Sequence, residues 1–197
     1  MLTIKHNVST IVKLILNHVI SSIYALVLLM IVYAVFGIDK IFIASIVSII
    51  FYLYLVYSFM WHAGAKDANS FYHLELSPYG GFGLITVATL PAILTNLISC
   101  VLSLFGPTLD YSEYTFDYVY SVFYYINGLF VQNMYSGIFA LFVTSLKDIS
   151  PWLFLLSIIP AIAVGGVAYM FGFKSYRLRT LFGIEYDVEK EKVKKNY

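Results

Sequence analysis

Long apolar runs without a single charged residue take up most of the chain, separated by short polar links. Each run has roughly 20 residues or more, the length that a helix needs to cross a bilayer. Backbone groups in lipid must be satisfied within a helix or a closed barrel, and none of the runs alternates as barrel strands do. The five apolar segments are residues 14–36, 41–61, 82–105, 118–146 and 152–173. The pattern predicts an all-α polytopic membrane protein, with an antiparallel bundle of four or five transmembrane segments in a single domain over 1–173 and a charged tail over 174–197.

The links and the small residues within this pattern predict how the helices pack. Only residues 37–40 join the first two segments, and so short a link requires an antiparallel hairpin. Pro91 and Pro160 fall inside the third and last segments, where we expect kinks. Small residues four positions apart let helices approach closely and are expected at the packing seams. The pairs are Ser21 and Ala25, Ala44 and Ser48, Ala88 and Ala92, and Ala161 and Gly165.

The composition excludes a soluble fold and suggests a topology. Of the 197 residues, 60% are hydrophobic and 12% are charged, whereas a soluble domain has about 25% charged residues. Basic residues collect in the N-terminal tail, in residues 62–81 and after Phe173. Placing these regions in the cytoplasm puts ten of the twelve Lys and Arg residues inside, as the positive-inside rule favours. The N-terminus is then cytoplasmic, and the number of crossings is even.

Segment 118–146 is the one that we expect not to cross the bilayer. It contains Asn127, Gln132 and Asn133, and it is rich in tyrosines such as Tyr135, which are typical of the headgroup region. We therefore predict a re-entrant or interfacial segment and four true spans. The alternative is five spans with the C-terminal tail outside, because translocated tails do not always obey the charge rule.

The sequence contains no recognisable catalytic pattern. The apolar segments have no Asp, Glu, Lys or Arg, which disfavours proton-coupled transport. The motifs H-E-x-x-H and G-x-S-x-G are absent, so we expect no enzyme, no metal site and no cofactor. We expect His18 to be a hydrogen-bonded histidine near the headgroups. The polar residues Asn96, Asn127, Gln132 and Asn133 either line a conduit or form hydrogen bonds between helices.

Two polar regions are candidates for binding. We interpret residues 62–81 as a cytoplasmic loop that docks a partner protein. Its candidate docking residues are Gly64, Asp67, Asn69, Tyr79 and Gly80. Directly after the last segment, Lys174, Arg177 and Arg179 are expected to contact anionic lipid, at about 1 kcal/mol each.

Two stretches of the chain resemble a known family. GAKDAN, with Gly64, Asp67 and Asn69, followed by PYGGFGLITVATLP, is similar to a pattern in small uncharacterised integral membrane proteins of Gram-positive, clostridia-type bacteria. The ending YMFGFKSYRLRTLFG resembles the close of that family, whereas glycine stands at positions 80 and 81, at one of which the family pattern has a lysine. The resemblance implies a bacterial cell membrane and implies no function.

Two hypotheses about function follow. The first is a non-enzymatic accessory or scaffold subunit of a membrane assembly. The alternative is an oligomeric channel or facilitator for a small or amphipathic solute. Besides the lipid bilayer, the expected partner is another membrane protein or further copies of this chain, and no nucleic acid is expected.

Overall fold

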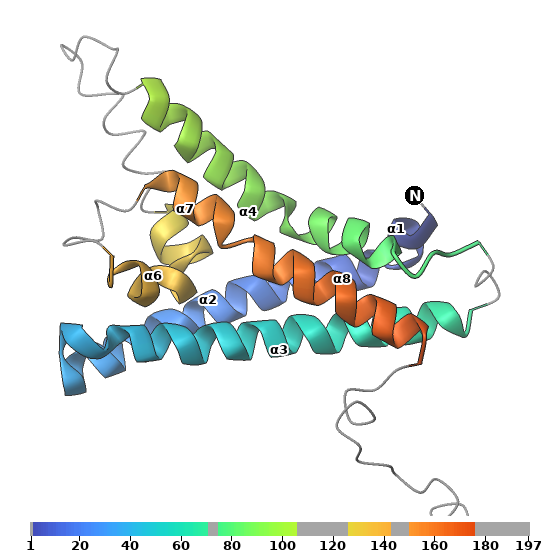
Figure 1. Cartoon of the computed structure of the whole chain (residues 1–197), viewed down its shortest axis with the longest axis horizontal. Helices are drawn as coiled ribbons and strands as arrows, with labels where there is room; N and C mark the ends of the chain where they lie inside the picture. The colour runs from blue at the N-terminus through green and yellow to red at the C-terminus, as the bar shows by residue number, and fades with distance from the viewer. Residues whose placement is uncertain (1, 71–74, 106–125, 143–149, 176–197) are drawn as a thin grey trace, which may run out of the picture.

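The structure is a computed structural model that describes residues 2–70, 75–105, 126–142 and 150–175. All the elements in these ranges are helical (Figure 1). In chain order they are α1 (Leu2–His6), α2 (Val8–Phe36), the short 3-10 helix η1 (Ile38–Lys40), α3 (Ile41–Ala68), α4 (Gly80–Phe105), the short π-helix η3 (Asn127–Val131), α6 (Asn133–Phe139), α7 (Pro151–Leu156) and α8 (Ile159–Phe173).

Four stretches of the described chain are long and apolar enough to cross a membrane. They are α2, α3, α4 and the stretch Trp152–Phe173, which comprises α7 and α8. The hairpin of α2 and α3 is closed by η1, and α8 packs along α3 in the most extensive helix pair (Figure 1). The predicted antiparallel membrane bundle is therefore confirmed.

One end of the bundle gathers the starts of α2 and α4 and the ends of α3 and α8 (Figure 1). The side chains of His6 and Asp67 approach to 3.5 Å there, and a β-carbon at Gly80 would lie 2.6 Å from Thr3 Oγ1. We call this end the basic end, because Lys5, Lys13, Lys66 and Lys174 belong to the segments that meet there. With an even number of crossings, the first spanning helix starts and the last one ends on the same side, as α2 and α8 do here (Figure 1).

The predicted small-residue seams lie inside the bundle. All eight residues of the four pairs are buried. The closest approach is the crossing of α3 and α8, where a β-carbon at Gly64 would overlap the backbone oxygen of Tyr169. A β-carbon at Gly172 would likewise overlap the backbone oxygen of Trp61. Glycine is required at both positions because the two backbones are in direct contact.

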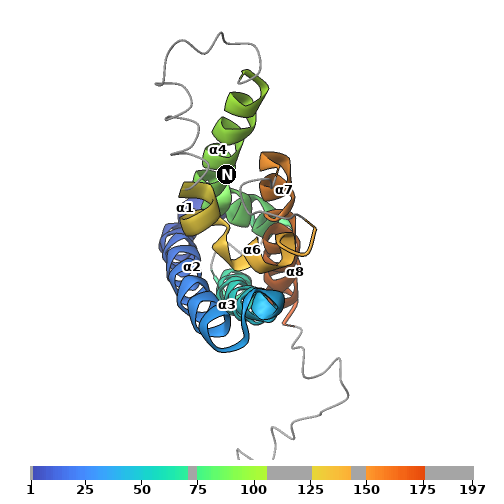
Figure 2. The same cartoon turned by 90° about the vertical axis from the view of Figure 1, so that its left-hand side faces the viewer.

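Residues 126–142, the described part of the predicted fourth segment, form no spanning helix. They contain η3 and the seven-residue helix α6, which meet at Gln132. Helix α6 packs against α2 and α3 and lies beside them in Figure 2. This agrees with the prediction of four spans, while residues 118–125 and 143–146 lie outside the described residues. Tyr135 is buried in the core, and its position near the headgroups stays a prediction.

The helix boundaries correct the prediction of a loop over residues 62–81. Helix α3 continues past Trp61 to Ala68, and α4 begins at Gly80, so both ends of this stretch are helical. Helix α2 also begins six residues earlier than its predicted start at Leu14. The sequence analysis ended the segments at the first charged or polar residues. The helices continue because Asp67 has polar partners in the interior and because Lys13 and Lys66 extend outward from exposed positions.

Both predicted proline effects are present. Helix α4 bends near Pro91, and its second half diverges from α2 and α3 (Figure 1). The hydroxyls of Thr89 and Thr95 donate to backbone carbonyls one turn before them, at Ile85 and Pro91, a type of bond that often accompanies helix bending. Pro160 lies in the first turn of α8, directly after the break that separates α7 from α8.

Candidate functional site

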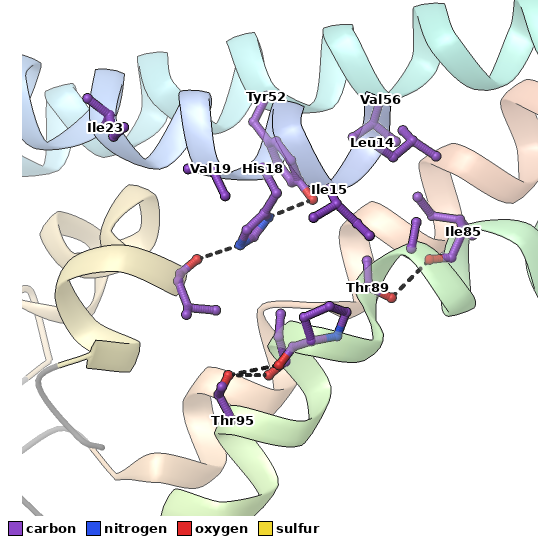
Figure 3. Close-up of a pocket in the computed structure, with 14 residues that line it drawn as sticks. Leu14, Ile15, His18, Val19, Ile23, Tyr52, Val56, Ile85, Thr89 and Thr95 are labelled. Carbon is purple, nitrogen blue, oxygen red and sulfur yellow. Dashed lines mark hydrogen bonds between the residues drawn. The ribbon is translucent and has the colours of Figure 1, made fainter. Parts of the chain in front are cut away.

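A cleft of about 450 Å³ lies between α2, α3 and α4 (Figure 3), and Pro91 is among its lining residues. Its volume is within the roughly 300–1,000 Å³ range of small-molecule sites. The bend of α4 opens it, since the second half of α4 turns away from α2. The lining residues are Leu14, Ile15, His18, Val19 and Ile23 of α2, Tyr52 and Val56 of α3, Ile85, Ala88, Thr89, Pro91, Ala92 and Thr95 of α4, and Val131.

The mouth of the cleft faces the membrane. Val19 and Ile23 line it and are exposed on the outside of α2, and Pro91 is exposed on α4. These residues belong to helices long and apolar enough to span a bilayer, so we expect lipid chains around them. The wall contains mostly aliphatic side chains and no Asp, Glu, Lys or Arg. The cleft is therefore suited to an apolar or amphipathic molecule that enters from the bilayer.

His18 provides the most polar part of the cleft wall. Its Nδ1 lies 3.1 Å from the Tyr52 hydroxyl, and its Nε2 lies 2.8 Å from the backbone oxygen of Val131 (Figure 3). The expectation of a hydrogen-bonded histidine is confirmed. Its position differs, because His18 is the eleventh residue of α2, about 15 Å along the helix from its start. The ring joins α2, α3 and η3 at the cleft.

A second, much smaller cavity of about 10 Å³ adjoins the polar part of the cleft. It shares four lining residues with the cleft, namely His18, Tyr52, Thr89 and Ala92. The remaining wall includes Gln132, Tyr135 and Ser157. The two cavities are therefore neighbours, and the smaller one has uncharged polar residues as well as apolar ones in its wall.

The four predicted intramembrane amides do not gather around one cavity. Each forms a hydrogen bond with a different part of the bundle, and all four are buried. Asn96 donates to Phe154 O, Asn127 to Thr95 O, and Asn133 to Ser22 O, while Gln132 Oε1 lies 2.6 Å from Ser157 Oγ. Of the two interpretations, hydrogen bonds between segments fit this geometry, and Gln132 alone of the four also reaches a cavity adjoining the cleft.

The carboxylate of Asp67 forms a separate polar cluster at the basic end. Its side chain is 0% exposed. Its Oδ2 accepts hydrogen bonds of 2.6 Å from Asn7 Nδ2 and from the Tyr169 hydroxyl. His6 Nε2 lies 3.5 Å from Oδ1. A buried carboxylate needs such partners to offset its lost hydration, and here they come from α1, from Asn7 between α1 and α2, and from α8.

The predicted docking residues are spread between buried and exposed positions. Gly64 and Asp67 are buried against α8, so the interpretation of both as exposed loop residues is wrong. Gly80 opens α4 and faces Thr3. Asn69 and Tyr79 are exposed, and Asn69 Nδ2 donates to Ala65 O. Of the predicted docking residues, Asn69 and Tyr79 are therefore accessible to a partner at this end, whereas Gly64 and Asp67 are not.

Of the predicted lipid-contact residues, Lys174 is described by the structure. It is exposed and caps the end of α8. Arg177 and Arg179 lie outside the described residues, so their contact with anionic lipid stays a prediction.

The sequence analysis did not identify the cleft. Its polar side chains, such as His18, Tyr52 and Thr89, come from three separate segments of ordinary composition. One local signal was available, because Ala88 and Ala92 flank Pro91 on α4. Small residues around a helix-bending proline leave space beside the helix, but the side chains opposite that space depend on the fold.

The searches found no matching protein-family model, curated protein or solved structure. The class of the chain therefore rests on its own structure. Four apolar helices of spanning length, arranged in an antiparallel bundle, define a multi-pass integral membrane protein.

Proposed function

We propose that the protein binds an apolar or amphipathic molecule from the bilayer in the cleft between α2 and α4, as a non-enzymatic membrane protein of a bacterial cell membrane. The observation that carries this proposal is the cleft itself, which is about 450 Å³ in volume and opens between spanning helices. This is the amphipathic-solute form of the second hypothesis from the sequence. A binding protein, a carrier and a facilitator share this first step.

The lining supports a lipid-like ligand over an ion or a sugar. An ion or a sugar needs several polar groups to replace its water, whereas this cleft presents mostly aliphatic carbon. The amides expected in a polar conduit each form a hydrogen bond between segments, as with Asn96 and Phe154 O. The accessory-subunit hypothesis stays a prediction, with Asn69 and Tyr79 as its exposed residues.

Blocking the mouth of the cleft tests the proposal. The purified protein in phosphatidylcholine vesicles is photolabelled with a hexadecyl chain that carries a diazirine, and the labelled peptides are mapped by mass spectrometry. We expect labelling of α2 and α4 peptides around Val19 and Pro91. Val19→Trp should reduce this labelling by about tenfold, equivalent to about 1.4 kcal/mol of binding free energy, because the indole fills the mouth.

Val27→Trp is the matched control. Val27 is on the same helix and is 51% exposed, against 48% for Val19, but it does not line the cleft. We expect Val27→Trp to leave the labelling unchanged. Equal labelling of the two variants, or labelling spread evenly over all lipid-facing helices, would overturn the proposal.

A further inference from the structure

Two residues that line the small cavity each carry a polar group with no hydrogen-bond partner among the described residues. The two groups are Gln132 Nε2 and the hydroxyl of Tyr135. The residues are 1% and 7% exposed, so bulk water does not reach them freely. Each buried polar group without a partner costs about 1–3 kcal/mol. Two of them on residues that line one cavity indicate that the cavity receives a polar atom.

The hydrogen bonds of Ser157 determine which kind of polar atom fits. Ser157 Oγ lies 2.6 Å from both Gln132 Oε1 and Phe154 O, and its single proton can be donated to only one of them. If Phe154 O accepts it, the Gln132 amide can turn over, since its oxygen and nitrogen have nearly the same shape. Gln132 then offers the cavity an acceptor in one orientation and a donor in the other. A hydroxyl group is able to donate and to accept, so it satisfies both orientations.

Size and charge restrict the ligand further. The small cavity has about 10 Å³, close to the space that one water-sized oxygen occupies. No charged side chain lines it or the adjoining cleft. A carboxylate, phosphate or ammonium head would therefore be buried without a counter-charge, at high cost. His18, which also belongs to the wall, already faces the Tyr52 hydroxyl and the Val131 carbonyl.

We infer that the ligand is a single-chain lipid alcohol, with its hydroxyl in the small cavity and its chain in the cleft. The hydroxyl bonds to Gln132 and Tyr135, and the hydrocarbon chain passes Thr89 and Ala92 toward the mouth between Val19 and Ile23. This inference rests on the proposed function and specifies the ligand class for the same cleft.

The test compares head groups on one chain length. Hexadecanol, hexadecane, hexadecanal and palmitic acid compete with the photoreactive hexadecyl probe for labelling of the cleft peptides in the same vesicles. We expect hexadecanol to compete about tenfold better than hexadecane, with the aldehyde between them and the acid no better than hexadecane. Tyr135→Phe and Gln132→Leu should each reduce the advantage of the alcohol by about threefold to tenfold while leaving competition by hexadecane unchanged.

Ser45→Ala is the control for a loss of packing around α6. Ser45 is on α3, away from the cavity, and its Oγ accepts a 2.8 Å hydrogen bond from Gly137 N on α6, the helix that also contains Tyr135. The substitution removes this bond. It should leave the ratio of alcohol to alkane competition unchanged.

The outcomes separate this inference from the proposed function. If alcohol and alkane compete equally, an ordinary buried water satisfies Gln132 and Tyr135, and the inference is overturned while binding in the cleft stands. If palmitic acid competes best, the inference of an uncharged head group is overturned. If no competitor protects the cleft peptides, the proposed function itself fails.

Discussion

Gly64 on α3 lies directly against the backbone carbonyl of Tyr169 on α8, with no room for a β-carbon between them. This contact keeps the two most extensively paired helices at their observed separation. Replacement by alanine would force the backbones apart. We expect Gly64→Ala to destabilise the protein by about 1–3 kcal/mol, as overpacking in a tight core does. Thermal unfolding in detergent, followed by the fluorescence of Trp61 on the same helix, measures the change.

Gly83 offers the control for this substitution. It is also in a spanning helix, and a β-carbon there would meet no atom within 4 Å. Gly83→Ala should leave the unfolding temperature unchanged or raise it, because alanine favours the helix by up to about 1 kcal/mol over glycine. Equal effects of the two alanines would contradict the direct backbone contact of α3 and α8.

Asp67 is expected to hold α8 to α3 through the hydroxyl of Tyr169. Asp67→Ala removes the acceptor of that 2.6 Å bond and of the bond from Asn7. We expect a loss of about 1–3 kcal/mol in unfolding free energy. Asp39→Ala, at an exposed position in η1, should have little effect.

A double-mutant cycle identifies the partner of Asp67. Tyr169→Phe should be destabilising in the natural protein and nearly neutral when Asp67 is already alanine, because the hydroxyl then has no carboxylate to bond to. The measurement is the unfolding free energy of the four proteins. Additive effects would mean that the two residues act independently.

Asn96 is expected to stabilise the bundle without lining a conduit. Asn96→Leu removes its bond to Phe154 O, and buried hydrogen bonds between membrane helices contribute about 0.5–2 kcal/mol. We predict a lower unfolding temperature and unchanged ligand binding per folded molecule. Thr86→Val is a suitable control, because Thr86 bonds within its own helix to Phe82 O. A change in ligand binding at full stability would support the conduit.

Pro91 is expected to keep the cleft open. Pro91→Ala restores a backbone donor and removes the ring that disfavours a straight helix. The second half of α4 should then move toward α2, which shortens the distance between spin labels at Met30 and Leu104, both exposed. Labelling of the cleft by the hexadecyl probe should fall in parallel. An unchanged spin-label distance would show that packing, and not the proline, bends α4.

The membrane class and the packing seams could be predicted because they depend on local patterns. A run of apolar residues of spanning length determines a helix in lipid whatever surrounds it. The pair Ala161 and Gly165 shows the same principle, because small residues at four-residue spacing are typical of close packing between membrane helices. Counting basic residues also predicted an even number of crossings, which the arrangement at the basic end reflects.

The interior polar contacts could not be predicted, because each depends on residues far apart in the sequence. Asp67 was expected in a loop, since a carboxylate ends an apolar run. It is buried because Asn7 and Tyr169, 60 and 102 positions away, supply donors. The link between His18 and Val131 O has the same origin. Only the packed bundle brings these groups together, so the cleft beside them had no signature in the sequence.

The short helices between α4 and α7 also bear on how the protein is made. Residues 127–137 bond to Ser22 on α2, to Ser45 on α3 and to Ser157, which follows α7. Ser157 is synthesised after residues 127–137, so the last hydrogen-bond partner of this stretch reaches the membrane after the stretch itself. An isolated stretch with Asn127, Gln132 and Asn133 enters lipid poorly, since its amides would be unpaired there. Assembly of the interior is therefore completed only after Ser157 has been translated, and a chain truncated before Ser157 would leave the Gln132 amide without that partner.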